Sequence, residues 1–92
     1  MKFEWDKSKA LSNLQKHRVS FEEAATIFGD PRAVTIPDLD HSDGEPREVT
    51  IGLSCNMIIT VVSHTDRHGR IRIISARRAT KKEQRVYLED KI

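Results

Sequence analysis

Residues 57–78 read MIITVVSHTDRHGRIRIISARR, with two apolar runs on either side of a short polar turn. The first run, residues 57–62, carries no charge and is rich in β-branched side chains, which predicts a strand buried on both faces. Residues 66–69 end in a glycine and predict a hairpin loop of four residues. The stretch therefore predicts a β-hairpin, and we interpret the rest of the chain around it.

The second run predicts a strand with one basic face. Arg70 and Arg72 fall on one side and the isoleucines that follow each of them on the other, because side chains alternate along a strand. Cross-strand pairing is expected to bring His64, Asp66 and Arg67 close to these two arginines. A basic surface beside a titratable histidine is suited to chemistry on phosphate groups.

Length and composition indicate a single domain, residues 1–92, with a core of modest size. Charged residues make up 33% of the chain with both signs mixed, which is within the range of globular proteins. No apolar run approaches the length of a membrane span, and no signal-peptide pattern is visible. We therefore expect a cytoplasmic protein with no membrane partner. The single Cys55 cannot form an internal disulfide, which agrees with that location.

The net charge of +2 is unevenly distributed along the chain. Residues 61–92 hold nine of the sixteen Lys and Arg residues, and seven of these nine lie within residues 67–82. Residues 29–60, in contrast, carry an excess of acidic side chains. Clustered basic residues favour a polyanionic partner, because each phosphate contact releases counterions.

The first third of the chain predicts a short strand and two helices. Residues 3–5 are expected to form an edge strand. Apolar residues at helical spacing predict a helix over residues 7–17, which the preceding aspartate caps. A second helix over residues 21–28 begins at a capping box formed by Ser20 and Glu23.

The remaining two thirds predict strands followed by one helix. Residues 32–37 and 47–53 are expected to be strands on either side of an acidic loop, residues 38–46, and the hairpin follows. A second capping box predicts a last helix from residue 81 to about residue 90. The order of strand, two helices, four strands and helix predicts an α+β fold, in which helices cover an antiparallel meander.

Three blocks of the sequence resemble the BrnT family, the toxin halves of type II toxin–antitoxin pairs. The blocks are FEWDKSKALSNLQKHRVSFEEAATIFGDP, DHSDGEPR and SHTDRHGRIRIISARRATKKEQRVY. They occur in the family's order and span residues 3–87. The resemblance implies a RelE-like fold, a small antiparallel sheet with helices packed beside it.

The same resemblance implies an activity and partners. The activity is cleavage of RNA, either free or on the ribosome, which halts translation and growth. The partner is a BrnA-type antitoxin whose ribbon-helix-helix part binds operator DNA, so that DNA is reached only through the antitoxin complex. That complex is expected to repress its own operon.

The third block supplies the candidate catalytic residues, which are His64, Asp66, Arg67, Arg72, Arg77 and Arg78. Cleavage by the 2′-hydroxyl of RNA needs a base, an acid and groups that hold the charge of the phosphorane. Arginine serves the last role because its planar fork binds two phosphate oxygens, and His64 is the best acid or base because the reference pKa of histidine is about 6.5. This route requires no metal and no cofactor. Four further residues are expected to hold the RNA: Arg70, Lys81, Lys82 and Arg85.

These candidates also have structural interpretations. His64 is equally compatible with a buried, hydrogen-bonded histidine, and Asp66 with a cap on the turn. Either Arg77 or Arg78 is a candidate to pair with Glu83 or with the acidic loop.

The acidic loop resembles a calcium site in composition only. An EF-hand needs glycine at the sixth position and glutamate at the twelfth. Counted from Asp38, Gly44 is the seventh residue and Val49 is the twelfth, so no metal site is expected.

Two other functions are consistent with the sequence. One is a module of the same fold that binds RNA or the ribosome without cleaving it, in which the arginines matter and His64 does not. The other is a protein whose main role is to shape a repressor complex through its apolar surface. An independent DNA-binding protein is disfavoured because no helix-turn-helix with a basic recognition helix is visible.

Overall fold

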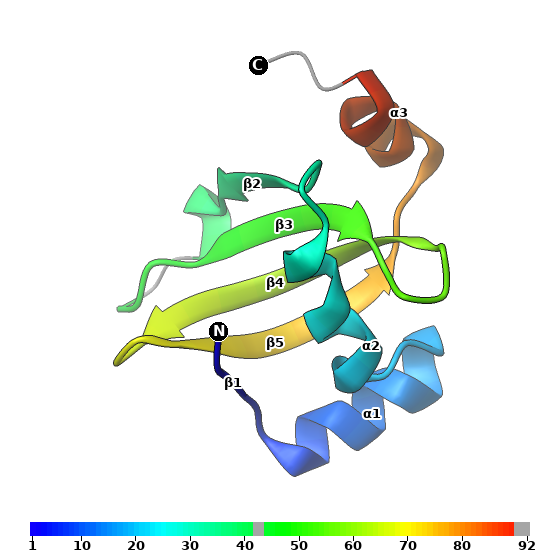
Figure 1. Ribbon diagram of the computed structural model, residues 1–92. Coiled ribbons are helices and arrows are strands. Elements are labelled where there is room, and N and C mark those ends of the chain that lie inside the picture. Colours follow the sequence, from blue (N-terminus) through cyan, green and yellow to red (C-terminus); the bar gives the residue numbers. More distant parts are fainter. Residues whose placement is uncertain (42–43, 90–92) are drawn as a thin grey trace.

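Five strands form a single sheet in the structure, a computed structural model that describes residues 1–41 and 44–89 (Figure 1). The strands are β1 (Phe3–Glu4), β2 (Val34–Pro37), β3 (Glu48–Leu53), β4 (Ile59–Arg67) and β5 (Arg70–Arg78). Their order in the sheet is β1-β5-β4-β3-β2, so the strands that are consecutive from β2 to β5 are also neighbours in space. The prediction of an α+β fold with a meander of four strands is confirmed.

Within the described residues, three α-helices and two short 3₁₀ turns complete the fold. The α-helices are α1 (Lys7–His17), α2 (Phe21–Thr26) and α3 (Lys81–Glu89), and the 3₁₀ turns are η1 (Ile27–Gly29) and η2 (Leu39–His41). Asp6 and Ser20 cap α1 and α2 as predicted, each accepting a hydrogen bond from a backbone N–H of the first turn. The end of the last helix predicted at residue 90 lies outside the described residues. Within the described ranges, no helix has the length and apolar character needed to cross a bilayer.

The sheet departs from the expected antiparallel arrangement at one pairing. β1 runs parallel to β5, with Phe3 opposite Ile71 and Glu4 opposite Arg72. No turn joins these two strands, because the chain leaves β1 through α1 and α2 and reaches the far edge of the sheet at β2. The direction of β1 is therefore not fixed by a hairpin, and the sheet is mixed.

The central hairpin is tighter than its sequence predicted. β4 continues to Arg67, which pairs directly with Arg70, so the turn consists of His68 and Gly69 alone. Both turn residues have positive φ, 54° and 78°, as a type I′ turn requires. At the other end, the strand starts at Ile59 rather than at Met57, which lies in the preceding turn with φ of 63°. The predictions of a four-residue loop and of a strand from residue 57 were wrong.

The two faces of the sheet are covered unequally. α1 and α2 pack on one face, which we call the helix face, around a core that contains Phe21, Ile27, Val62 and Ile73. The opposite face, which we call the open face, carries a smaller apolar cluster in which Tyr87 of α3 packs with side chains of β3 and β4. α3 lies away from the other two helices and covers only one end of this face (Figure 1). The rest of the open face is covered by no α-helix among the described residues.

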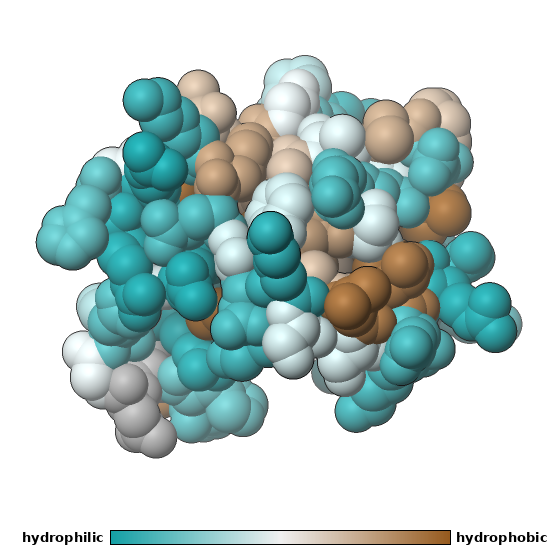
Figure 2. All heavy atoms as spheres, turned by 90° about the horizontal axis from the view of Figure 1, so that it is seen from below, coloured by the Kyte–Doolittle hydropathy of each residue, from teal (hydrophilic) through white to brown (hydrophobic). Residues whose placement is uncertain are grey.

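The outer surface of α1 is partly apolar. Leu11 and Leu14 are 64% and 43% exposed, and they line a shallow groove together with Trp5 and Phe21. Figure 2, which views the molecule from below Figure 1, shows an apolar patch surrounded by hydrophilic side chains. The apolar stripe of α1 is thus wider than the part that the core covers.

A buried side chain of α1 continues the pairing of β5 beyond the short strand β1. The Asn13 amide donates to the carbonyl of Ala76 at 2.8 Å and accepts from the N–H of Ala76 at 3.1 Å. It also donates to the carbonyl of Val19 at 3.0 Å. An amide group has the same donor and acceptor as a peptide unit, so Asn13 satisfies the edge of β5 where no strand covers it.

We predict that Asn13→Ala lowers the free energy of unfolding by about 2–4 kcal/mol, because it leaves buried backbone groups of Ala76 and Val19 without partners. Urea denaturation followed by circular dichroism measures the effect. Ser12→Ala, an exposed change on the same helix, is the matched control and is expected to change stability little. Equal stabilities of the two variants would contradict this role for Asn13.

Candidate nucleic-acid interface

A bulge between β4 and β5 decides which arginines share the open face. Ser63 lies opposite Ser75, whereas the next residue of β4, His64, lies opposite Ile73. Ile74 is therefore an extra residue in β5, and the alternation of side chains shifts by one position beyond it. The bulge changes the face of every later residue of the strand.

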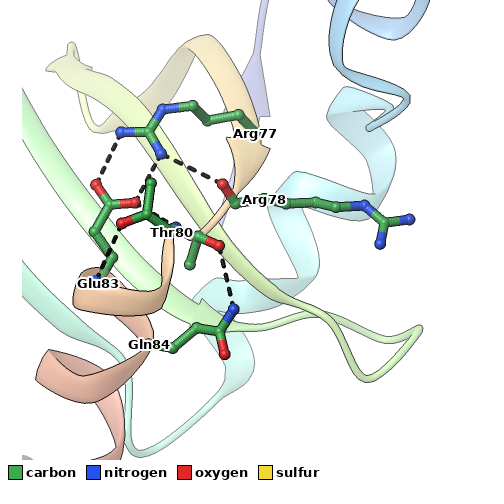
Figure 3. Close-up of polar contacts among 6 residues, drawn as sticks. Arg77, Arg78, Thr80, Glu83 and Gln84 are labelled. Atoms are coloured by element: carbon green, nitrogen blue, oxygen red, sulfur yellow. Dashed lines mark hydrogen bonds and ion pairs between the residues drawn. The ribbon is translucent and has the colours of Figure 1, made fainter.

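Because of this shift, Arg77 joins Arg72 on the open face. Strict alternation from Arg72 would have placed Arg78 there and Arg77 on the helix face. Instead, Arg77 lines a groove together with Val61 and other side chains of the open face. Arg78 points away from Arg77 and is exposed (Figure 3). The expectation that both arginines lie on one surface was wrong.

Arg67 and Arg70 lie on the same face at the hairpin end of the sheet. They pair directly across the two strands, and Arg72 lies opposite Thr65 two positions further along. Arg67 and Arg72 line a small pocket whose wall also includes Arg47 and Ile74. The open face therefore carries basic side chains from the hairpin turn to the end of β5.

Each of the three arginines predicted to be catalytic on this face is paired with a glutamate from a different part of the chain. Arg72 donates to Glu4 of β1 at 3.0 Å. Arg67 donates to Glu45 through both Nε and Nη2, and the hydrogen bond from Arg67 holds the pKa of Glu45 below its usual value. These contacts fix the guanidinium groups in orientation before any ligand arrives.

The third pair, Arg77 with Glu83, is the most extensive. The Nη1 and Nη2 atoms of Arg77 donate to the two carboxylate oxygens of Glu83 at 2.7 and 2.9 Å (Figure 3). Glu83 also accepts from the N–H of Thr80 at 2.8 Å, and its own N–H donates to the Thr80 hydroxyl at 3.2 Å. The hydrogen bonds from Arg77 and Thr80 lower the pKa of Glu83 to about 2. The predicted capping box of α3 is thus confirmed, and it also holds Arg77.

A groove of about 660 Å³ runs along the open face between α3 and the segment that joins β2 to β3. Ser63, Ser75 and Arg77 contribute from the sheet, and Lys82 contributes from α3. The groove and the small pocket at Arg67 and Arg72 share two lining residues, Arg47 and Ile74. The two hollows therefore form one continuous basic surface, which fits an extended polyanion.

His64 lies on the helix face and is 4% exposed. Its Nε2 atom lies 2.7 Å from the hydroxyl of Thr50, which in turn lies 2.7 Å from the hydroxyl of Thr35. The ring of Phe28 meets the imidazole edge-on, with ring centroids 4.9 Å apart. Burial lowers the pKa of His64, and the nearby Glu48 carboxylate opposes that shift. The expectation that His64 shares a surface with the arginines was wrong, because its place in the alternation of β4 points it into the core.

The remaining predicted residues are divided between the two sides of the sheet. Asp66 follows His64 by two positions and falls on the same side of β4, away from Arg67. Lys81, Lys82 and Arg85 are exposed on α3, and of the three only Lys82 lines the groove. The arrangement that sequence reasoning missed is the contribution of Arg47 and His41 to this groove. Both residues lie in the DHSDGEPR block. The resemblance of this block to the BrnT family was therefore a sequence signal that pointed to this segment.

The fold and the groove define a small α+β protein with a basic surface on one face of its sheet. Residues 5–83 match the family described as "Ribonuclease toxin, BrnT, of type II toxin-antitoxin system". The chain belongs to this family. It is also similar to the crystal structure of the ribonuclease toxin BrnT from Brucella abortus, with 25% identity and a TM-score of 0.69 over 88% of this chain and 99% of the other. A search of curated proteins found no match.

We predict that the free energy of unfolding falls as the pH is lowered from 7.5 to 5. The pKa of His64 is lower in the folded protein than in the unfolded chain, so the unfolded chain binds a proton that the core excludes. The stability from neutral His64 is therefore complete above the unfolded pKa of about 6.5 and is lost below it. Carboxylates with lowered pKa, such as Glu83, lose their stabilisation only below about pH 4.5 and do not contribute in this range.

Denaturation at both pH values measures the effect, and His64→Gln is expected to remove most of the difference. His17→Gln, a change at the end of α1, serves as the control and should retain it. An identical pH dependence in the His64 variant and the control would contradict the attribution of this effect to buried His64.

Proposed function

We propose that the chain is a toxin that cleaves RNA in the open-face groove without a metal ion. The observation that carries the proposal is that Arg67, Arg72 and Arg77 lie on one accessible face of a chain from a ribonuclease-toxin family. In this proposal, the 2′-hydroxyl of a nucleotide attacks the adjacent phosphorus, and the arginines hold the charge that develops on the phosphate oxygens. Cleavage then halts translation and growth.

The ion pairs of the open face are compatible with this role. Arginine has five N–H donors and is not neutralised by one carboxylate contact. Arg77 uses Nη1 and Nη2 toward Glu83 and the carbonyl of Arg78, and its Nε takes part in no hydrogen bond with the described residues. A phosphate can approach along that edge while Glu83 keeps the guanidinium in place. The glutamates thereby reduce the rotamer freedom that each arginine loses when RNA binds.

The roles proposed for the predicted residues follow their positions. The reacting phosphate of the RNA, or a phosphate next to it, is contacted by Arg67, Arg72 and Arg77. The RNA on either side of that phosphate is held by Arg70 and Lys82. Lys81 and Arg85 extend the basic surface beyond the groove. His64, Asp66 and Arg78 contact no RNA in this proposal.

We further propose that a BrnA-type antitoxin neutralises the toxin. A type II system has an antitoxin partner, and this chain belongs to such a family. The proposed partner carries a ribbon-helix-helix part that binds operator DNA, so the complex contributes to repression of its own operon. The exposed basic face is the surface that a neutralising partner has to block.

In a cleavage assay on naked RNA with chelator present, Arg77→Ala is expected to lower the rate about 10–100-fold. This factor corresponds to the loss of charge-assisted hydrogen bonds that contribute about 1.5–3 kcal/mol. Arg78→Ala is the matched control, because it removes the same side chain from the adjacent position on the other face. Its rate is expected to equal that of the wild type.

Glu83→Gln separates phosphate binding from helix docking, since it weakens the link to α3 and keeps Arg77. Its rate is expected to fall less than that of Arg77→Ala, because the guanidinium is kept but is oriented less firmly. Thermal melting is followed in parallel. A loss of cleavage in Arg78→Ala, with full cleavage in Arg77→Ala, would place the site on the other face. If the wild type cleaves neither naked RNA nor RNA on translating ribosomes, the non-cleaving module is the correct function.

The antitoxin is expected to compete with RNA for the open face. Titration of antitoxin into a complex of the toxin with labelled RNA, under conditions that block cleavage, should release the RNA completely. A stable ternary complex would show that the partner binds elsewhere.

A further inference from the structure

A second histidine lies in the groove, on the segment between β2 and β3. His41 is the last residue of η2, and Asp38 directly precedes that turn. Residues three apart are eclipsed in a 3₁₀ turn. Accordingly, the Nδ1 atom of His41 lies 3.2 Å from both carboxylate oxygens of Asp38.

The Asp38–His41 pair is anchored at one end and accessible at the other. The backbone N–H of Asp38 donates to the carbonyl of Arg47 at 2.8 Å, which ties the residue before η2 to the residue before β3. The side chain of Asp38 is 18% exposed, whereas that of His41 is 68% exposed. The carboxylate is therefore held in place, and the imidazole is left in contact with solvent and with any ligand in the groove.

Both residues line the same groove as Arg77 and Lys82. This position distinguishes His41 from His64, whose ring is enclosed in the core on the other side of the sheet. The groove thus combines cationic side chains that suit a phosphate with an imidazole that suits proton transfer. No other histidine lines it among the described residues.

The contact with Asp38 determines what the imidazole can do. A carboxylate at Nδ1 favours the tautomer with the proton on that nitrogen, which leaves the lone pair of Nε2 as the basic site. The same carboxylate stabilises the imidazolium that forms when Nε2 accepts a proton. This is the arrangement that a general base requires.

We propose that His41, oriented by Asp38, is the general base of the RNA cleavage reaction. The inference rests on the proposed function and assigns a residue to its proton transfer. Nε2 takes the proton of the 2′-hydroxyl as the 2′-oxygen bonds to phosphorus, and the bond from phosphorus to the 5′-oxygen breaks. Water protonates the departing 5′-oxygen, and the imidazolium returns its proton to the hydroxide so formed. The products are a 2′,3′-cyclic phosphate and a 5′-hydroxyl, and the enzyme is unchanged.

The test measures cleavage and binding separately for His41→Gln, Asp38→Asn and the control His17→Gln. The single-turnover rate of His41→Gln is expected to fall about 10²–10⁴-fold, the range for loss of a general base. Its affinity for an RNA analogue with a 2′-deoxy nucleotide at the cleavage point, measured by fluorescence anisotropy, should be unchanged. Asp38→Asn is expected to lose about 10–100-fold in rate, as groups that orient an imidazole typically do.

Chemical rescue distinguishes proton transfer from a structural effect. Added imidazole is expected to restore part of the activity of His41→Ala and to leave Arg77→Ala unaffected. A His41→Gln variant as fast as the wild type, or a His41→Ala variant that imidazole does not rescue, would overturn the inference while the proposed function stands. A wild type that cleaves no RNA would overturn the proposed function, and this inference with it.

Discussion

The extra residue at Ile74 is the constraint on which the rest of the structure depends. The bulge lets one strand present Ile73 and Ala76 to the helix face while Arg72 and Arg77 both reach the open face. Without it, a strand with these residues would bury a cation or expose part of its core, because alternation has a strict period of two. A single irregularity in one hairpin thereby reconciles the apolar core with the basic groove.

The open face combines fixed geometry with partly exposed basic side chains. Its arginines are held by glutamates from β1, from the β2–β3 connection and from α3, so segments distant in sequence act together on one surface. The pair between Arg77 and Glu83 links the groove to the capping box that starts α3. The contacts that attach the start of α3 to the sheet therefore also orient the Arg77 guanidinium.

Much of this architecture is encoded locally in the sequence. The order of the elements, the N-cap at Ser20, the capping box at Thr80 and the basic character of β5 all follow from short patterns of side chains. The bulge at Ile74 does not follow from a local pattern. An isoleucine is apolar whichever face it occupies, so the sequence of β5 does not show where the alternation shifts. The position of His64 in the core depends on packing against Phe28, a residue far away in the sequence. The groove depends on segments that meet only in the folded protein, so no local pattern shows that His41 lines the same groove as Arg77.

The amide of Asn13 has a consequence for the molecule as a whole. An uncovered strand edge is a template on which another chain can add a strand, and long strands that guard such edges are themselves prone to exchange between molecules. Here β1 is only two residues long, and one side chain from a helix completes the protection. At the edge of the sheet next to β1, the backbone of β5 is thus satisfied by the Asn13 side chain. This side chain cannot exchange into another molecule unless α1 unfolds. Protection of this border therefore depends on the helix as well as on the two residues of β1.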